Sequence, residues 1–244
     1  MHGLILAGGE GSRLVHEGIE TPKPLVQVGG QPLIVRLLEQ LSALECETLT
    51  CMVRADLTDV FAVLHGRDFG RPFTVVSCRT PSSLHTLVGG LGAVGEGNVF
   101  CTMVDSVMPS ADWRAVYDGA TTALARGADA VLAVTPFVDD ESPLHVRTDP
   151  NGFVLELPDS RETTVPAGTL VTGGVYAFSP GARTAATNAL ARGVTRMRGF
   201  LRDFVARGAR IATLSVARII DVDHASDLRL ANVWMTSAGP GPKG

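Results

Sequence analysis

The sequence predicts an α/β fold built on a doubly wound, mostly parallel sheet that carries an inserted antiparallel patch. In the first half of the chain, short apolar runs alternate with segments of helical spacing. That alternation is typical of right-handed βαβ units, which form parallel sheets. After Val134 the alternation stops, and two apolar runs flank Asp149-Pro150-Asn151-Gly152. Asn-Gly between such runs is a hairpin signal, so the second half predicts the antiparallel patch.

Each predicted strand is a short apolar run, and each predicted helix rests on apolar residues three or four positions apart. Leu33, Leu37 and Leu41, for example, fall on one helical face. In chain order, the predicted strands are Gly3–Leu6, Thr48–Val53, Phe73–Cys78, Val99–Val104, Ala130–Val134, Leu144–Arg147, Phe153–Leu157, Leu170–Phe178 and Arg210–Ser215. The predicted helices are Gln31–Leu44, Leu57–Leu64, Ser82–Val94, Trp113–Ala125, Gly181–Leu190, Gly199–Ala206 and Ala225–Met235.

These elements predict a single domain over residues 1–236, because no repeat or linker divides them. The stretch from about 136 to 198 interrupts the βα alternation and is predicted to be an insertion. Residues 237–244 are rich in Gly and Pro and predict a disordered tail.

The composition is that of a globular protein with a mild negative charge. Lys and Arg number 21 against 25 Asp and Glu, which gives a formal net charge of −4. Nucleic-acid coats and basic membrane-surface proteins need a cationic face, so no nucleic acid and no membrane is expected as a partner. No apolar run approaches the roughly 20 residues of a membrane span, and no signal peptide is visible, which predicts a cytoplasmic location. The four cysteines lack metal-ligand spacing, and the oligomeric state is left open, a homo-oligomer included.

The first predicted strand leads directly into a Gly-rich segment, Leu6-Ala7-Gly8-Gly9-Glu10-Gly11-Ser12-Arg13-Leu14. Glycines remove the side chains that keep a ligand off the backbone, and the freed N–H groups can form an anion site. Ligands of open α/β sheets bind beyond the carboxyl ends of strands, which is where this segment lies. A plain tight turn explains the same residues equally well. The Rossmann and P-loop glycine patterns are both missing from it.

A second block begins shortly after Arg13 and has its lysine ten residues beyond it. It reads Pro22-Lys23-Pro24-Leu25 and is followed by Val28-Gly29-Gly30-Gln31-Pro32-Leu33. The two prolines fix the backbone around Lys23 and hold its ammonium group in one place. A guanidinium and an ammonium beside an amide-lined loop suit a polyphosphate.

Together, the two blocks resemble the signature of the nucleotidyltransferase superfamily that makes nucleotide sugars from NTPs and sugar 1-phosphates, the nucleotide-sugar pyrophosphorylases. The family pattern is L-A-G-G-x-G-[ST]-R-L, then P-K-P-L, then G-x-P-L, and all of these spacings match. His16 and Gly18 stand where family members often carry Pro and Thr. The match is tight only over residues 3–33. The resemblance implies a Rossmann-like, GT-A-like fold, a Mg²⁺-dependent transferase, and two substrates, an NTP and a sugar or cyclitol phosphate.

The resemblance also implies a metal site. Family members place a metal-binding Asp after the fourth strand, and Asp105 follows Val104 at that place. A second ligand comes from a late segment, where both Asp221 and Asp223 are available. We expect a carboxylate oxygen of Asp105 to lie within about 8 Å of one from Asp221 or Asp223, because a single hydrated Mg²⁺ can bridge that distance.

The same resemblance implies roles for the two cationic residues. Arg13 would neutralise the β- and γ-phosphates, and Lys23 would contact the α-phosphate and the incoming phosphate; these are the predicted catalytic residues. Thr80, Ser82 and Ser83 either contact the base or ribose or cap the helix that begins there. The predicted nucleotide-binding residues are Leu6, Ala7, Gly8, Gly9, Gly11, Ser12, Thr80, Ser82 and Ser83.

The acceptor side is predicted within the inserted patch. A strand containing Gly173 and Gly174 resembles the family strand that lies against the sugar; these glycines either admit the sugar or form a β-bulge. Family members often carry Glu-Lys-Pro upstream, but this chain has Glu156-Leu157-Pro158, so the lysine is missing. The candidates to replace it are Arg161, Arg196 and Arg198. The predicted acceptor-binding residues are Thr172, Gly173, Gly174, Glu156 and Arg198.

The implied reaction needs no protein nucleophile. A phosphate monoester has a second pKa near 6, so its oxygen is largely deprotonated at neutral pH. Two alternatives remain open. The first is the same chemistry on a non-sugar acceptor of the molybdopterin or isoprenoid type, against which the Pro22–Leu25 block argues; the second is a non-catalytic nucleotide-binding homologue.

Overall fold

The structure is a computed structural model, and it describes residues 1–138, 142–158 and 169–237. The strands are β1 (His2–Ala7), β2 (Gln27–Val28), β3 (Gln31–Pro32), β4 (Leu49–Arg54), β5 (Phe73–Cys78), β6 (Val99–Met103), β7 (Ser106–Val107), β8 (Ala130–Thr135), β9 (His145–Thr148), β10 (Val154–Glu156), β11 (Leu170–Phe178), β12 (Ile211–Ser215) and β13 (Ile220–Asp221). The helices are α1 (Ser12–His16), α2 (Leu33–Ala43), α3 (Thr58–Leu64), α4 (Ser83–Ala93), α5 (Ser110–Ala125), α6 (Pro180–Ala191), α7 (Met197–Ala206) and α8 (Ala225–Ser237), with a short 3-10 turn, η1 (Lys23–Leu25). None of these helices is both long and apolar enough to span a membrane.

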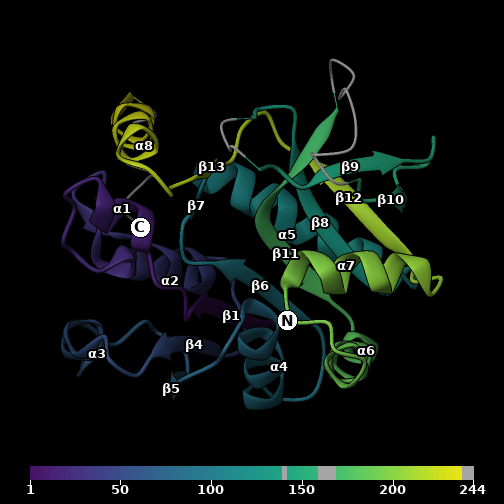
Figure 1. Cartoon of the computed structure of the whole chain (residues 1–244), viewed down its shortest axis with the longest axis horizontal. Helices are drawn as coiled ribbons and strands as arrows, with labels where there is room; N and C mark the ends of the chain where they lie inside the picture. The colour runs from purple at the N-terminus through teal and green to yellow at the C-terminus, as the bar shows by residue number, and fades with distance from the viewer. Residues whose placement is uncertain (139–141, 159–168, 238–244) are drawn as a thin grey trace.

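A mixed nine-stranded sheet organises the molecule (Figure 1). β5, β4, β1 and β6 lie side by side in that order and are parallel. β11 runs antiparallel to β6 and pairs along its other edge with β8 and β9. The chain therefore leaves β1 toward β4 first and fills the β6 side later. This reversal is the switch point of a doubly wound sheet, and ligands bind outside the carboxyl ends of the strands there.

The two faces of the sheet are covered by different helices. Successive residues of a strand point to opposite faces, and β1 is apolar on both: Leu4 and Leu6 face one side, while Ile5 and Ala7 face the other. α2, α3 and α5 pack against the face of Ile5, and α4, α6 and α7 pack against the face of Leu4. A strand covered on both sides explains why β1 is a continuous apolar run in the sequence.

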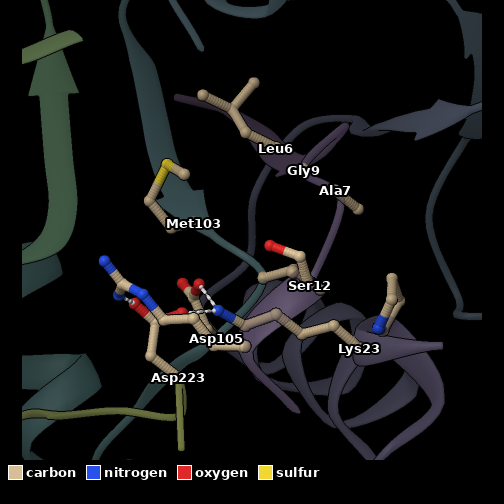
Figure 2. Close-up of a pocket in the computed structure, with 12 residues that line it drawn as sticks. Leu6, Ala7, Gly9, Ser12, Lys23, Met103, Asp105 and Asp223 are labelled. Carbon is tan, nitrogen blue, oxygen red and sulfur yellow. Dashed lines mark hydrogen bonds and ion pairs between the residues drawn. The ribbon is translucent and has the colours of Figure 1, made fainter. Parts of the chain in front are cut away.

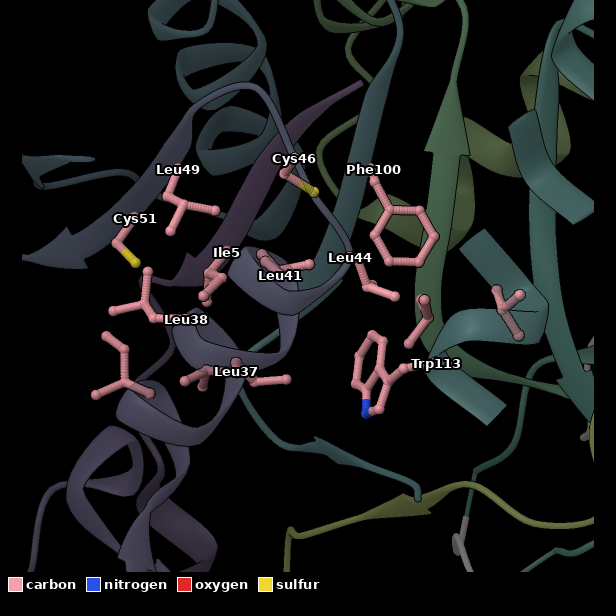
Figure 3. Packing of buried hydrophobic residues seen from close by; sticks show 14 of the residues in the cluster. Ile5, Leu37, Leu38, Leu41, Leu44, Cys46, Leu49, Cys51, Phe100 and Trp113 are labelled. Atoms are coloured by element: carbon pink, nitrogen blue, oxygen red, sulfur yellow. The ribbon is translucent and has the colours of Figure 1, made fainter. Parts of the chain in front are cut away.

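The packing on the Ile5 face shows how the helical spacing is used. Figure 3 shows Leu37, Leu38 and Leu41 of α2 packed with Ile5 of β1 in one cluster. All four side chains are buried. Burying leucines of this kind contributes about 1.5–3 kcal/mol each, so the apolar face of α2 secures the helix against the sheet.

The expected α/β class and its antiparallel patch are confirmed, with shifts at several boundaries. The helix expected from Gln31 begins at Leu33, because Gln31–Pro32 pairs with Gln27–Val28 as a small hairpin. The expected turn at 149–152 joins β9 and β10, and the carboxylate of Asp149 accepts the N–H groups of Asn151 and Phe153 at 2.8 Å. Ser237, expected in the tail, is the last residue of α8, whereas 238–244 lie outside the described residues.

Candidate active site

The Gly-rich segment leaves β1 and turns directly into α1. Gly11 has φ +63°, a left-handed conformation that L-residues with side chains rarely adopt. A Cβ at Gly11 would also lie 2.9 Å from Cβ of Lys23. Glycine is thus required here by both the backbone conformation and the close approach of Lys23.

Lys23 lies on the η1 turn, between Pro22 and Pro24, and its side chain is almost fully buried. Its ammonium nitrogen, Nζ, forms ion pairs with Asp105 and Asp223, as Figure 2 shows. Burial lowers the pKa of Lys23, but the nearby carboxylates, Asp105 foremost, together raise it well above its ordinary value. Lys23 therefore stays charged and neutralises part of this acidic cluster.

The acidic residues meet because two short strands pair. β13 lies antiparallel to β7, with Asp221 opposite Ser106, and Val222 N donates to the carbonyl of Asp105 at 3.1 Å. One carboxylate oxygen from each of Asp105, Asp221 and Asp223 lies within 4.8 Å of the others. The expected proximity of Asp105 to the late aspartates is confirmed, and both late residues take part.

This carboxylate cluster has unused hydrogen-bonding capacity. Oδ1 of Asp105 and Oδ1 of Asp221 are buried and have no hydrogen-bond partner among the described residues. Burial, reinforced by Asp105, raises the pKa of Asp221 well above its ordinary value. Buried carboxylate oxygens without partners are costly unless a cation or proton compensates them. The donor set of hard oxygens fits Mg²⁺.

Arg13 follows the Gly-rich turn on α1 and reaches the same cluster. Its Nη1 lies 2.5 Å from Oδ2 of Asp223, and about half of its side chain is exposed. Arg13 and Lys23 thus both line a hollow of about 330 Å³ at the carboxyl end of β1. Figure 2 shows Lys23, Asp105 and Asp223 in this hollow. The hollow is lined by Leu6, Ala7, Gly9, Gly11, Ser12, Arg13, Lys23, Pro24, Met103, Val104, Asp105 and Asp223.

A second hollow of about 210 Å³ adjoins the first, and Leu6, Gly9 and Met103 line both. It is lined by Leu6, Gly8, Gly9, Glu10, Thr80, Pro81, Ser82, Ser83, Thr86 and Met103. All of the predicted nucleotide-binding residues therefore line one or both of the two hollows. Met103 belongs to no motif and was not predicted; Pro24 and Glu10 stand within the two motif blocks but were not predicted to line the site.

The turn before α4 is held by side-chain contacts other than capping. Ser82 precedes α4, yet its side chain makes no capping hydrogen bond; it donates to the carbonyl of Thr195. The hydroxyl of Ser83 accepts the backbone N–H of Met197 at 3.0 Å. Thr80 and Thr86 share a 2.6 Å hydrogen bond. These contacts fix the wall of the second hollow against the start of α7.

The segment that carries Asp223 is anchored on both sides. Oδ2 of Asp227 accepts the N–H groups of Asp223 and His224 at 3.0 and 2.6 Å. Glu17, at the end of α1, accepts the N–H of Ala225 and contacts His224 Nδ1, each at 2.6 Å. The Gly-rich turn and the metal-candidate segment are therefore tied together. Asp227 lies in the first turn of α8 and caps its start through these two bonds; no sequence motif had marked Glu17.

The predicted acceptor residues are only partly brought together. Thr172 and Gly173 line a third hollow with Asp221. A Cβ at Gly173 would lie 2.5 Å from Ile219, so the chain's own side chain fills that space. Gly174 has φ +73°, and a Cβ there would lie 2.6 Å from Oγ of Ser106. The pairing of β11 with β8 is irregular at these glycines, which matches the bulge alternative.

The two charged acceptor candidates lie apart from these three hollows. Glu156 is on β10 and forms an exposed ion pair with Arg147. Arg198 lines a different hollow and donates to the backbone carbonyl of Ser142 at 3.0 Å; Arg196 lines the same hollow. Arg161 lies outside the described residues. Their acceptor roles remain predictions.

Cations and carboxylates that converge beyond the carboxyl ends of parallel strands, beside an amide-lined turn, are typical of nucleotide-binding α/β proteins. The chain belongs to the MobA-like NTP transferase domain family, whose model matches residues 3–202. The superfamily resemblance read from the sequence is thereby confirmed.

Solved structures share the fold at low sequence identity. A protein assigned as glucose-1-phosphate thymidylyltransferase from Bacillus anthracis is 20% identical with a TM-score of 0.82, covering 99% of this chain and 98% of its own. The inositol-1-phosphate CTP transferase from T. maritima is 14% identical with a TM-score of 0.79, covering 99% and 97%. The GT-A-like nucleotidyltransferase fold is therefore confirmed.

Two curated relatives match shorter stretches. N-acetylmuramate alpha-1-phosphate uridylyltransferase from Caulobacter vibrioides is 33% identical over 109 residues, 43% of this chain and 45% of that protein. Glucose-1-phosphate cytidylyltransferase from Salmonella typhimurium is 45% identical over 42 residues, 17% of this chain and 16% of that protein. These matches span less than half of either relative.

Proposed function

We propose that this protein is a Mg²⁺-dependent nucleotidyltransferase that moves an NMP group from an NTP to a sugar or cyclitol phosphate and releases pyrophosphate. The observation that carries the proposal is the convergence of the Gly-rich turn, Lys23 and three aspartates around one hollow. The relatives that act on N-acetylmuramate 1-phosphate, glucose 1-phosphate and inositol 1-phosphate, by their names, support this acceptor class.

The proposed reaction is an in-line displacement without a covalent enzyme intermediate. An oxygen of the acceptor phosphate attacks the α-phosphorus of the NTP, and the bond from that phosphorus to the bridging oxygen of the β-phosphate breaks. The acceptor oxygen is already deprotonated at neutral pH, so no general base is required. Catalysis then depends on positioning and on charge stabilisation, as in other phosphoryl transfers.

The chain's own cations carry most of that stabilisation. The guanidinium of Arg13, half exposed at the mouth of the hollow, binds the β- and γ-phosphates and stabilises the leaving pyrophosphate. The ammonium of Lys23 lies deeper and contacts the α-phosphate and the acceptor phosphate. Amides of the turn at Gly8–Gly11 bind phosphate oxygens. Asp105 with Asp221 or Asp223 would hold Mg²⁺, which would supply charge neutralisation at the phosphates.

The two adjoining hollows bind different parts of the NTP. The first, with Arg13, Lys23 and Asp105, takes the phosphates. The second, lined by Thr80, Ser82 and Ser83, takes the base and ribose. The acceptor approaches from the side of Asp221, where Thr172 and Gly173 line a small hollow of about 40 Å³.

A panel assay tests the proposal. Purified protein is incubated with each of ATP, GTP, CTP, UTP and dTTP against hexose 1-phosphates, myo-inositol 1-phosphate and farnesyl phosphate, with Mg²⁺ or with EDTA. We expect pyrophosphate release with at least one sugar or cyclitol phosphate, loss of release with EDTA, and loss in a folded Asp105→Asn variant. Turnover only with farnesyl phosphate assigns a non-sugar acceptor, and no turnover with any pair supports the non-catalytic alternative.

A further inference from the structure

Asp223 uses both of its carboxylate oxygens on the two predicted catalytic cations. Its Oδ2 lies 2.5 Å from Nη1 of Arg13, and its Oδ1 forms an ion pair with Nζ of Lys23. Figure 2 shows this ammonium between Asp105 and Asp223. The other two aspartates of the cluster differ, because Oδ1 of Asp105 and Oδ1 of Asp221 are buried without a hydrogen-bond partner in the described part of the chain. The oxygens left open for a cation therefore belong to Asp105 and Asp221.

Among the described residues, only Asp223 holds the side chain of Arg13. The guanidinium makes no second hydrogen bond or ion pair with them. About half of the side chain is exposed, and it extends from α1, a helix of five residues. An exposed arginine side chain samples many rotamers unless a partner fixes it. The guanidinium has five N–H donors, so the contact with Asp223 leaves others available to phosphate oxygens.

Lys23 depends on Asp223 less than Arg13 does. Its side chain is almost fully buried, lies between two prolines, and pairs with Asp105 as well. Loss of Asp223 would leave the ammonium with one carboxylate fewer but still fixed by Asp105 and the surrounding chain. The influence of Asp223 on the reaction is therefore exerted mainly through Arg13.

The backbone that carries Asp223 is fixed relative to α1. The N–H of Asp223 donates to Oδ2 of Asp227 at 3.0 Å. Glu17, at the end of α1, accepts the N–H of Ala225 at 2.6 Å. Two separate contacts, Glu17 with Ala225 and Arg13 with Asp223, thus join the two segments. A functional group supported in this way keeps its geometry before a substrate binds.

We infer that Asp223 is a positioning residue, which holds the guanidinium of Arg13 at the hollow that takes the phosphates and shares the ammonium of Lys23 with Asp105, and that it is not a metal ligand. The inference rests on the proposed function, in which Arg13 stabilises the leaving pyrophosphate. An oriented guanidinium needs no reorganisation as charge develops on the leaving group. Loss of that orientation should therefore lower kcat more than it weakens NTP binding.

Steady-state kinetics and calorimetry separate these two effects. The control for Asp223→Ala is Asp203→Ala, because Asp203 also pairs with two cations, Arg192 and Arg207. With the best NTP and acceptor, we expect kcat of Asp223→Ala to fall roughly tenfold or more, as misplacement of a catalytic group does. The dissociation constant of the NTP without acceptor should change by less than about threefold, because repulsion between the carboxylate and the phosphates is lost as well. Asp203→Ala should keep the wild-type value of both.

A double-mutant cycle tests whether Asp223 acts through Arg13. In the Arg13→Ala background, Asp223→Ala should lower kcat by less than about threefold further, since the group that it positions is absent. Asp223→Asn should keep part of kcat, because its single amide oxygen can accept from one cation. If Asp223→Ala does not fold, Asp223→Asn replaces it in every measurement.

Two further measurements do not depend on turnover. In the protein without ligands, the guanidinium ¹H–¹⁵N signals of Arg13, assigned by their loss in Arg13→Ala, should exchange with water more slowly in wild type than in Asp223→Ala. With the NTP bound, the dissociation constant of Mn²⁺, measured by electron paramagnetic resonance, should stay within about threefold of wild type in Asp223→Ala and rise roughly tenfold or more in Asp105→Asn.

Four outcomes overturn the inference: kcat of Asp223→Ala within threefold of wild type, an equal loss of kcat with and without Arg13, equal exchange of the Arg13 signals in both proteins, or a loss of Mn²⁺ affinity as large as in Asp105→Asn. Absence of pyrophosphate release with any pair is a different result. It contradicts the proposed function, while the exchange of the Arg13 signals still decides whether Asp223 positions that side chain.

Discussion

Lys23 is the residue on which the site's charge balance depends. It is buried, lies between two prolines, and pairs with Asp105 and Asp223. Three carboxylates face it and Arg13, so the cluster without substrate is one negative charge in excess. An ammonium in this position compensates the carboxylates and, in the proposed reaction, also contacts the phosphates.

Lys23→Arg should therefore fail to preserve activity. A guanidinium is planar and wider than an ammonium, and Gly11 already approaches the Lys23 side chain closely. We expect kcat to fall by roughly 10²–10³, the effect of losing one preorganised charge donor. Steady-state pyrophosphate release checks this. An arginine variant with most of the wild-type activity would mean that Lys23 contributes charge alone.

Arg13→Ala should separate catalysis from stability. Arg13 is about half exposed and lies on the five-residue helix α1, so its removal exposes no core. We expect kcat to fall by roughly 10²–10³ while Tm stays within about 2 °C of wild type. Arg207→Ala, which removes a comparably exposed arginine far along the chain, is the control. Equal activity in both variants would contradict the leaving-group role.

The sequence predicted most of the residues that line the two hollows of the candidate site, because the family motifs include them. The Gly-rich turn, Lys23 and Asp105 were all identified in this way. The ion pair of Lys23 with Asp223 was not predictable, since it depends on β13 pairing with β7 more than a hundred residues earlier in the chain.

At the scale of elements, the bulge in β11 connects the acceptor side to the carboxylates. Ser106, next to Asp105, donates its hydroxyl to the carbonyl of Gly173 at 2.8 Å. Gly174 makes this approach possible through its positive φ and missing side chain. The bulge therefore holds β7, and with it β13, against β11.

Gly174→Ala should lower the free energy of unfolding for two reasons. The left-handed conformation costs a residue with a side chain about 1–2 kcal/mol, and the new Cβ would lie 2.6 Å from Oγ of Ser106. Gly152→Ala is the matched control, because φ there is +80° but the nearest atom is 3.6 Å away. We expect thermal unfolding to show a clearly larger loss of Tm for Gly174→Ala. Equal losses would mean that Ser106 moves aside without cost.

The ion pairs of Asp203, near the end of α7, should make the stability of the fold depend on pH. Asp203 pairs with Arg192 and Arg207, and despite partial desolvation these arginines lower its pKa. A carboxylate whose folded pKa is depressed stabilises the fold above its unfolded pKa of about 3.9 and loses that contribution as pH falls through the folded value. Asp203→Asn should lower Tm by about 2 °C at pH 7 and have no effect near pH 2. A difference that persists at pH 2 would indicate packing rather than charge.

Element prediction succeeded where a pattern had room to repeat. The apolar spacing of α2 and the buried run of β1 span several residues, and both were identified. The pairs β2–β3 and β7–β13 consist of two-residue strands. Two residues carry no periodicity, so their pairing follows from tertiary packing alone.

At the scale of the whole molecule, the sheet order explains why distant segments form one site. β1 and β6 are adjacent and parallel, so the Gly-rich turn and Asp105 leave the sheet at the same edge. β13 then returns across that edge and adds Asp221, and Asp223 follows it. The doubly wound topology was predictable from the alternation of strands and helices. The approach of residues 221–223 to Asp105 was expected only from the family resemblance, and the pairing of β13 with β7 was not predicted.

The buried carboxylate of Asp221 should lower the stability of the ligand-free protein. Asp221 is not ion-paired with Lys23, and burial together with Asp105 raises its pKa well above the ordinary value. A group whose folded pKa is raised lowers stability progressively as pH rises from its unfolded pKa toward its folded one. Asp221→Asn removes this cost and the excess negative charge, so Tm without ligands should rise by a few degrees at pH 7, and by less near pH 4.

Asp105→Asn is the contrasting variant, because it removes an ion-pair partner of Lys23. It should not raise Tm. Wild type should gain Tm with Mg²⁺ and NTP, and both variants should lose activity and most of that gain. Differential scanning fluorimetry with and without these ligands measures the Tm of each variant and its Tm gain with ligands. Pyrophosphate release measures the activity. If Asp221→Asn lowers Tm at pH 7, the buried carboxylate is structurally compensated, and the acidic cluster is a stabilising feature of the fold rather than a site kept ready for a cation.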